Sequence, residues 1–469
     1  MVRWIRWPPG ELVERRDTHS PFHRRDATPI RLTLYLPLAP VPGTTGERAI
    51  SLLLALRRHG EHLSVTFANS SDVPRVEIAP TPMRSQFGQY FEVTITGSNS
   101  VTRTGVPADS FETHVDALGW RASQRLGGSQ TSAEDIRAAL LQVSAHVGTR
   151  NDLLVTNSPV LLALRDDPVL RRTNVVGLDE ATRVVGLLFR HRDTIALRNW
   201  EFDGRWAFYL ILGKVRVPEL DRYWSACVYS RPQRTDDLFE LGQSINIRLH
   251  RALELRDEIG CQFYQQHTNY TRDYTMAFLD YWALMLIGAL DAQARMTIRA
   301  YSLPLREQTA NFRDRNFPIQ LEKAGAPHLA EILKDAKNRA VLTLCRQLRN
   351  TIHGASYTAI GTTGFGDPSS FVRVAKTDAT VLRDAATTLG HPAARGLSEQ
   401  SGELWFEPYS FAHTLTSDVL RLVGTVAAAT DVTRFFNAAL PQEFTNPRQH
   451  RGDDDMFNPE TLADVDLLG

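Results

Sequence analysis

Alternation of apolar and polar residues predicts that the first part of the chain is rich in β-strands. Residues 30–36 and 90–96 alternate with period two, and shorter candidate strands lie at 63–67 and 76–78. One helical stretch at about 46–58 interrupts them. We therefore expect a β-rich N-terminal domain over residues 1–125, and this segment carries no recognisable catalytic signature.

The pattern changes over residues 126–235, where helical and strand patterns alternate. We expect helices at about 132–147, 161–165 and 179–190, and strands at 152–156 and 174–177. Ser132 begins a capping-type helix start, and Asp179 is the expected cap of the last helix. Alternation at this length predicts a parallel α/β unit followed by a linker.

Helical periodicity dominates from about residue 236 onward. The periodic segments cover about 237–267, 271–301, 327–353 and 410–438. Residues 354–405 are rich in Gly, Thr, Ser and Pro, which indicates loops with a hairpin. We expect an all-helical domain over 236–445 and a mobile tail over 446–469. The fold class is α+β multidomain.

Composition narrows the class of protein. Of 469 residues 42% are hydrophobic and 23% charged, the formal net charge is zero, and the longest apolar run, Ala283–Leu290, is too short to cross a bilayer. Cys227, Cys261 and Cys345 are far apart and odd in number, which argues against disulfides or a zinc site. We expect a cytoplasmic protein with no membrane contact, no cofactor and no metal.

Candidate chemistry lies at the end of the third long helical segment, in the string LCRQLRNTIHG of residues 344–354. On a helix, the apolar residues Leu333, Ala340, Leu344 and Leu348 share one side. The opposite side carries Arg339, Arg346, Asn350 and His353 within about 60° of one another. Arg349 lies one step round the helix, four residues before His353, and so is adjacent to it.

These residue types suit acid–base chemistry on a phosphodiester. The negative end of the helix dipole raises the pKa of a histidine in the last turn, and neighbouring arginines lower it. Such an imidazole can transfer protons, while guanidinium groups bind the phosphate and stabilise charge developing on its oxygens. From spacing alone, a solvated polar face is the commoner interpretation of such residues. The groups of His353, Arg349, Arg346 and Asn350 would suit a phosphodiester-cleaving site, and the wider string of residues favours that alternative.

The string LRNTIHG after long helices resembles the HEPN family (higher eukaryotes and prokaryotes nucleotide-binding). The resemblance covers about residues 240–440, with Phe278–Tyr281 as a weaker echo. The family motif is an arginine, four to six intervening residues and a histidine. Arg346 satisfies that spacing to His353, whereas Arg349 is followed by the favoured Asn350 but has only three intervening residues.

This resemblance implies a helical, dimeric, metal-independent endoribonuclease of a defence or toxin-like system, acting on tRNA, rRNA or mRNA. His353 would act as base or acid, Arg346 or Arg349 would hold the phosphate, and Asn350 would orient the ribose or phosphate. The product would carry a 2′,3′-cyclic phosphate, and the need for a 2′-hydroxyl would select RNA over DNA. The N-terminal region would bind a regulatory protein or trigger.

Two other functions remain open. The same helices could form a non-catalytic scaffold or sensor that dimerises and docks an effector. Alternatively, residues 130–193 are similar to the last third of a PIN-type nuclease, which gathers carboxylates around Mg²⁺. Ser158 stands where that family has an acid, so we expect a degenerate domain. A nearby aromatic cluster is expected to be core packing: Tyr264, Tyr270, Tyr274, Phe278, Tyr281 and Trp282.

Overall fold

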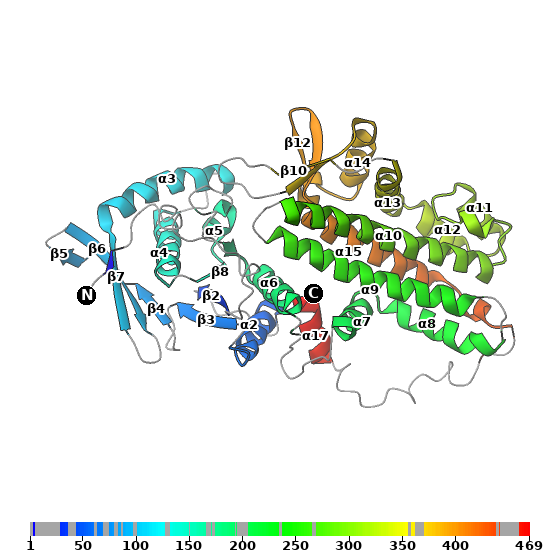
Figure 1. The fold of residues 1–469 in the computed structure, drawn as a ribbon, viewed down its shortest axis with the longest axis horizontal. Helices are drawn as coiled ribbons and strands as arrows, with labels where there is room; N and C mark the ends of the chain where they lie inside the picture. Colours follow the sequence, from blue (N-terminus) through cyan, green and yellow to red (C-terminus); the bar gives the residue numbers. More distant parts are fainter. Residues whose placement is uncertain are drawn as a thin grey trace. The chain divides into compact units, whose positions relative to one another are not determined.

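In a computed structural model, the chain forms two compact units (Figure 1). The first consists of Met1–Glu201 together with Leu467–Gly469, and the second of Phe202–Asp466. The structure describes residues 3–4, 29–35, 44–60, 63–68, 75–78, 83–85, 88–96, 101–126, 132–149, 151–165, 170, 174–192, 194, 205–233, 237–264, 269–354, 358–361, 370–437, 440 and 459–469. The division differs from the expected boundaries near 125 and 235. One sheet joins the residues on both sides of position 125, and the helices at 205–230 belong to the second unit.

A nine-stranded sheet is the centre of the first unit. Its strands are β1 (Arg3–Trp4), β2 (Ile30–Tyr35), β3 (Leu63–Ala68), β4 (Arg75–Ile78), β5 (Met83–Ser85), β6 (Gly88–Thr96), β7 (Val101–Pro107), β8 (Leu153–Thr156) and β9 (Val175–Val176). Five of them are parallel in the order β4-β3-β2-β8-β9, and β6, β7 and β5 extend the sheet antiparallel. The chain order in the parallel part is 3-2-1-4-5, that of a doubly wound α/β fold.

Helices cover this sheet. They are α2 (Thr45–Leu56), α3 (Ala108–Leu126), α4 (Ala133–Thr149), α5 (Pro159–Leu164) and α6 (Leu178–His191). The predicted start of α4 is confirmed, since Ser132 Oγ accepts from the amide of Asp135 at 3.0 Å and Asp135 Oδ2 accepts from the amide of Ser132 at 3.1 Å. The predicted cap of α6 is wrong: Gly177 occupies the cap position without a side-chain bond, and Asp179 lies inside the first turn.

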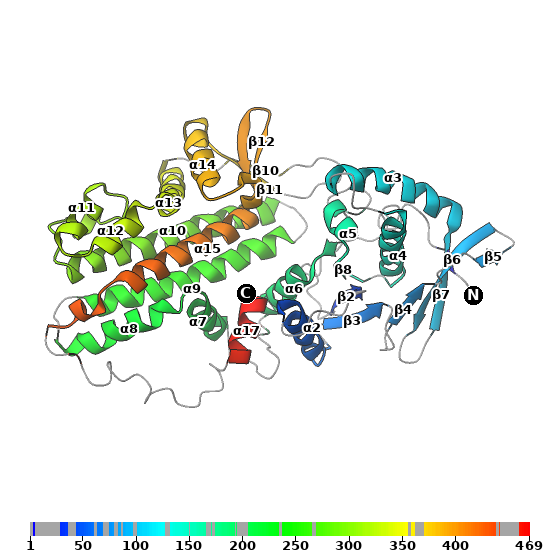
Figure 2. The same cartoon turned by 180° about the vertical axis from the view of Figure 1, so that it is seen from behind.

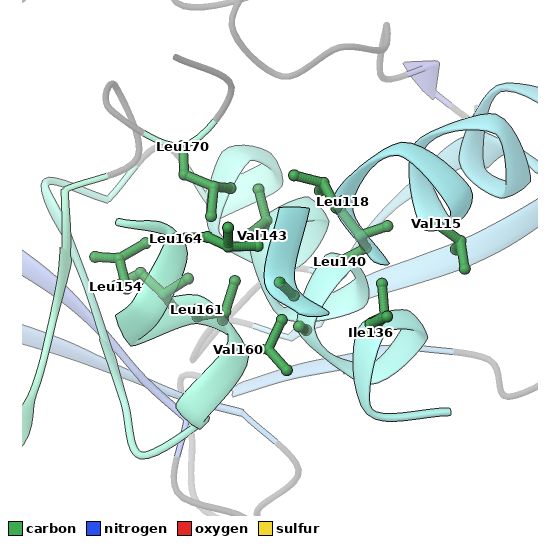
Figure 3. Close-up of a cluster of buried hydrophobic side chains, with 13 residues drawn as sticks. Val115, Leu118, Ile136, Leu140, Val143, Leu154, Val160, Leu161, Leu164 and Leu170 are labelled. Carbon is green, nitrogen blue, oxygen red and sulfur yellow. The ribbon is translucent and has the colours of Figure 1, made fainter. Parts of the chain in front are cut away.

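The core between α3, α4, α5 and β8 explains why these segments fold together (Figure 3). Each helix turns one apolar stripe toward the others, because leucine and valine recur at helical spacing. The labelled side chains that meet there are Val115, Leu118, Ile136, Leu140, Val143, Leu154, Val160, Leu161, Leu164 and Leu170. Helix α3 was not expected from the sequence. Because it packs with α4, α5 and β8, the segment expected to be a separate β-rich domain is part of one α/β unit.

The second unit is a helical bundle. Its helices are α7 (Arg205–Arg216), α8 (Glu219–Ser230), α9 (Leu238–Phe263), α10 (Asn269–Ala300), α11 (Asn316–Lys323), α12 (Pro327–Lys334), α13 (Ala336–Gly354), α14 (Lys376–Thr388) and α15 (Pro408–Ala429). The long helices α9, α10 and α15 lie side by side in both views (Figures 1 and 2), and α13 packs on α10. The expected long helices are present, but the segment 327–353 is two helices. Asp335 has an extended ψ of 135° and accepts from the amide of Asn338, so it ends α12 and caps α13.

Residues 354–405 contain more regular structure than the expected loops and hairpin. A four-stranded antiparallel sheet is formed by β10 (Thr358–Gly361), β11 (Ser370–Arg373), β12 (Leu397–Gln400) and β13 (Glu403–Phe406), in the order β10-β11-β13-β12. Helix α14 lies between β11 and β12 in sequence. The expected mobile tail includes a helix, α17 (Pro459–Leu468), whereas residues 441–458 lie outside the described part of the chain.

Helix α10 is the central helix on which the candidate site depends. Over Tyr270–Ala300 it is the one described helix long and apolar enough to cross a membrane, but a core helix of a soluble protein passes the same test. Trp282, Leu286 and Leu290 are buried, and the helix packs against α9, α13 and α15. We therefore describe α10 as a core helix of the bundle, in agreement with the sequence-based interpretation.

Candidate phosphate-binding site on helix α13

Helix α13 places its apolar and polar residues as its sequence predicts. Ala340, Leu344 and Leu348 are buried, and Leu333 of the preceding helix is buried beside them. On the opposite side, Arg346 and Asn350 are exposed. The polar face of this helix is therefore open to solvent while its apolar face anchors it to the bundle.

His353 lies in the last turn of α13, as expected from the position of Gly354. Its backbone is helical, but the side chains of residues 351–354 lie outside the part of the chain that the structure describes. The structure therefore brings Arg346, Arg349 and Asn350 to one helix surface that ends at the turn containing His353. It gives no distance from the imidazole to either arginine.

Arg349 is held by a carboxylate of the neighbouring helix. Its Nη1 lies 3.6 Å from Oδ2 of Asp291 on α10, with the Arg349 side chain 49% exposed and that of Asp291 26% exposed. Burial raises the pKa of Asp291, and the positive charges of Arg349, Arg295 and Arg248 act against that rise. Arg349 is therefore positioned by α10 through a long, half-exposed ion pair, which a phosphate can displace because such pairs are weak.

Three other arginines converge without a carboxylate. Arg339 Nη1 donates to the backbone carbonyl of Arg313 at 3.1 Å, and this contact joins α13 to the loop before α11. Burial and, to a smaller extent, the positive charges of Arg346 and Arg339 together lower the pKa of Arg313 to about 10. In the described part of the chain, none of these three side chains has an ion pair within 4.0 Å. We call Arg313, Arg339 and Arg346 the arginine cluster.

Sequence reasoning found two members of the cluster and missed the third. Arg339 and Arg346 were predicted on the polar face of α13 because they are seven residues, about two turns, apart. Arg313 comes from an irregular segment 26 residues before Arg339 in sequence. No local periodicity connects the two positions, so only the tertiary fold reveals the contact.

Some side chains of the aromatic cluster are buried in the core, and others are exposed to solvent. Trp282 is buried with its Nε1 donating to Thr416 Oγ1 at 2.9 Å, and Tyr264 packs on Phe263 and Tyr409. Tyr270, Tyr274 and Tyr281 are instead exposed by 75%, 56% and 58%. The expectation of core packing is wrong for these three tyrosines, which form an exposed row along α10.

Among the described residues of the first unit, the alternative site has no carboxylate cluster. In parallel sheets, ligands bind beyond the carboxyl ends of the strands. Asp152 lies at the amino end of β8, where its Oδ2 accepts from the amide of Arg31, while Glu180 is paired with Arg165 at 2.9 Å. No three His, Cys, Asp or Glu ligand atoms within the described part of residues 130–193 lie within 4.8 Å of one another.

A buried polar network occupies the middle of that sheet instead. Asn151 Nδ2 donates to Thr33 Oγ1 at 2.9 Å, His146 Nδ1 lies 3.1 Å from the same hydroxyl, and Thr156 Oγ1 donates to Gln142 at 2.8 Å. These contacts join α4 to β2 and β8. They pair the buried side chains of Thr33, Asn151 and Gln142, and this is a structural role.

The chain was compared with protein-family models, with curated proteins and with solved structures, and no match was found. Its chemistry is therefore inferred from its own residues.

Proposed function

We propose that this chain is a metal-independent endoribonuclease of the HEPN type, acting as a cytoplasmic homodimer in a defence or toxin-like system. The observation that carries the proposal is the solvent-facing surface of α13, which presents Arg346, Arg349 and Asn350 beside the turn that contains His353. Guanidinium and imidazole groups on one surface are the groups that bind a phosphodiester and transfer its protons.

In the proposed reaction, His353 removes the proton of the RNA 2′-hydroxyl. The 2′-oxygen attacks the adjacent phosphorus, the bond to the 5′-oxygen breaks, and that oxygen takes up a proton. The products are a 2′,3′-cyclic phosphate and a 5′-hydroxyl. The arginines stabilise the charge that develops on the phosphate oxygens, and Asn350 orients the ribose or phosphate.

The two arginines differ in how they are held. Arg349 is four residues from His353, about 6 Å along the helix, and is paired with Asp291. Arg346 is seven residues away, about 10 Å along the helix, and belongs to the arginine cluster. We assign the scissile phosphate to Arg349, which phosphate would draw away from Asp291, and a neighbouring phosphate to Arg346.

Purified wild type and His353→Ala test the proposal on structured and unstructured RNA in EDTA. We expect wild type to cleave and leave cyclic phosphate ends, and His353→Ala to lose about 10²–10⁴ in rate. The matched control is His328→Ala, an exposed histidine on α12, which should cleave as wild type does. Equal cleavage by His353→Ala, or cleavage that requires Mg²⁺, would reject the assignment. A stable oligomer that never cleaves would favour the non-catalytic scaffold.

A further inference from the structure

The arginine cluster is more than the proposed reaction needs. Cleavage requires a cation at the scissile phosphate and an imidazole, and Arg349 and His353 supply both. Arg313 and Arg339 lie farther along the surface, and Arg313 reaches it from a different segment of the chain. Because Arg313 and Arg339 lie beyond the groups proposed to react, we look for a binding role for them that is separate from catalysis.

Like charges held together without a carboxylate are typical of a site for an anion. The Arg313 side chain is half-buried, and the bond from Arg339 to its carbonyl fixes the backbone that carries it. Arg339 to Arg349 covers ten residues, about 15 Å along the helix. That length exceeds one phosphate group, so the surface fits a chain that carries several phosphates.

The exposed tyrosines add a second kind of contact. At 100° per residue, Tyr270, Tyr274, Tyr281 and Arg295 project from α10 within about 60° of one another. Tyr274 stacks on Phe278 with 22° between the ring planes, which leaves the tyrosine more than half exposed. Tyr281 and Arg295 are 14 residues, about 21 Å, apart along α10. Exposed aromatic rings and arginines along one surface are a combination that binds single-stranded nucleic acid, because unpaired bases stack on the rings.

We propose that the arginine cluster and the tyrosine row bind the single-stranded RNA that flanks the cleaved bond. Phosphates contact Arg313, Arg339 and Arg346 on α13 and its neighbouring loop, and bases stack on Tyr270, Tyr274 or Tyr281 of α10. This inference rests on the proposed function for the identity of the strand as substrate. It adds that the chain requires a strand of several nucleotides and disfavours a duplex, whose bases cannot stack on protein side chains.

Binding of a 2′-O-methyl RNA oligonucleotide tests this inference without cleavage, because the oligonucleotide has no nucleophilic hydroxyl. Fluorescence anisotropy with the full chain would measure affinity at several salt concentrations. We expect the double variant Arg313→Met, Arg339→Met to bind at least about tenfold more weakly at low salt. The slope of log affinity against log salt concentration should become shallower by about 1.4 for this variant, since each phosphate contact contributes about 0.7. Methionine keeps the apolar stem of each side chain, so folding is preserved.

Tyrosine variants separate stacking from charge. Tyr281→Leu should weaken binding about 5- to 100-fold and leave the salt slope unchanged, because stacking involves no counterion release. The control is Arg222→Met, an exposed arginine of α8, which packs on α9 and α15; it should bind as wild type does.

The outcomes distinguish this inference from the proposed cleavage. Equal binding of the double variant and wild type would overturn the inference even if wild type cleaves RNA. Equal binding of the duplex form, or of poly-glutamate of matched charge, would also overturn it. The expected variant pattern without any cleavage by wild type would support the binding surface and reject the endoribonuclease.

Discussion

Replacing Arg313 with methionine should stabilise the free protein, although it removes a half-buried side chain. The side chain makes no ion pair within the described part of the chain, and the positive charges of Arg346 and Arg339 act on its guanidinium group. The Arg313 amide donates to Asn311 Oδ1 and the Arg313 carbonyl accepts from Arg339, and neither backbone contact depends on the Arg313 side chain. Methionine retains most of the apolar stem.

The magnitude follows from Coulomb's law. Two like charges about 7 Å apart repel by about 1–2.5 kcal/mol at effective dielectric constants of about 20–40. The charges of Arg346 and Arg339 both act on Arg313, but solvent around the partly exposed groups reduces the effect, and we expect a gain of about 1–2 kcal/mol. That gain raises the Tm by about 3–6 °C in a unit of this size. Arg313 remains protonated at pH 7, because even its lowered pKa is about 10.

Thermal unfolding at low and high salt checks this reasoning. At about 1 M salt the Debye length is about 3 Å, so the Tm difference between Arg313→Met and wild type should shrink by more than half. Arg222→Met on α8 is the control and should change the Tm little at either salt concentration. A lower Tm for Arg313→Met at low salt, or a gain independent of salt, would refute the claim that repulsion dominates at this position.

Three further substitutions test the bundle around the site. Asp257→Ala should lower the free energy of unfolding by about 3–5 kcal/mol, since the buried Arg256 guanidinium and the Tyr209 hydroxyl both lose their carboxylate; chemical denaturation measures it. Trp282→Phe should destabilise by about 1–3 kcal/mol, with a smaller loss in a Thr416→Val background, where no hydroxyl is left unpaired; a double-mutant cycle gives the coupling. Asp291→Asn should remove part of the decline in stability as pH rises above about 4. The folded state of wild type holds that proton more tightly than the unfolded state, so wild type loses stability as the carboxyl ionises. An unchanged pH profile of unfolding for Asp291→Asn would contradict this cause.

Periodicity predicted the parts of the fold that depend on neighbours in sequence. The apolar side of α13 is buried at Ala340, Leu344 and Leu348, and the strands β2, β3 and β6 lie where alternation placed them. A hairpin was expected within residues 354–405, and β12 and β13 form one. The other two strands of that sheet were missed because they are only four residues long and too short to show a period, and helix α14 was missed as well. Asp335 was missed as a helix break because the apolar pattern continues across it.

The candidate site was predictable only along a single helix. Arg346 and Asn350 share a face with Arg339 by helical geometry, which the sequence contains. The contact between Arg339 and Arg313 and the pairing of Arg349 with Asp291 depend on how segments pack, which it does not reveal locally. The exposure of Tyr270, Tyr274 and Tyr281 was misjudged for the same reason: periodicity shows that residues share a side, but not whether another element covers that side.

The charge around α13 also bears on how a polyanion would be selected. Three arginines act on Asp291 and three more form the arginine cluster, so positive charge is concentrated around α13, while Asp418 is engaged by Arg395 at 2.6 Å. The whole chain has no net charge, so this excess is balanced elsewhere and its field fades within a Debye length of about 8 Å at physiological salt. Long-range attraction therefore contributes little, and binding depends on close contact with a few phosphates. We therefore expect the logarithm of the binding constant to fall only modestly with the logarithm of salt concentration, with a slope near that of three to four phosphate contacts. A slope typical of six to ten phosphate contacts would require a larger surface than α13 and α10 provide.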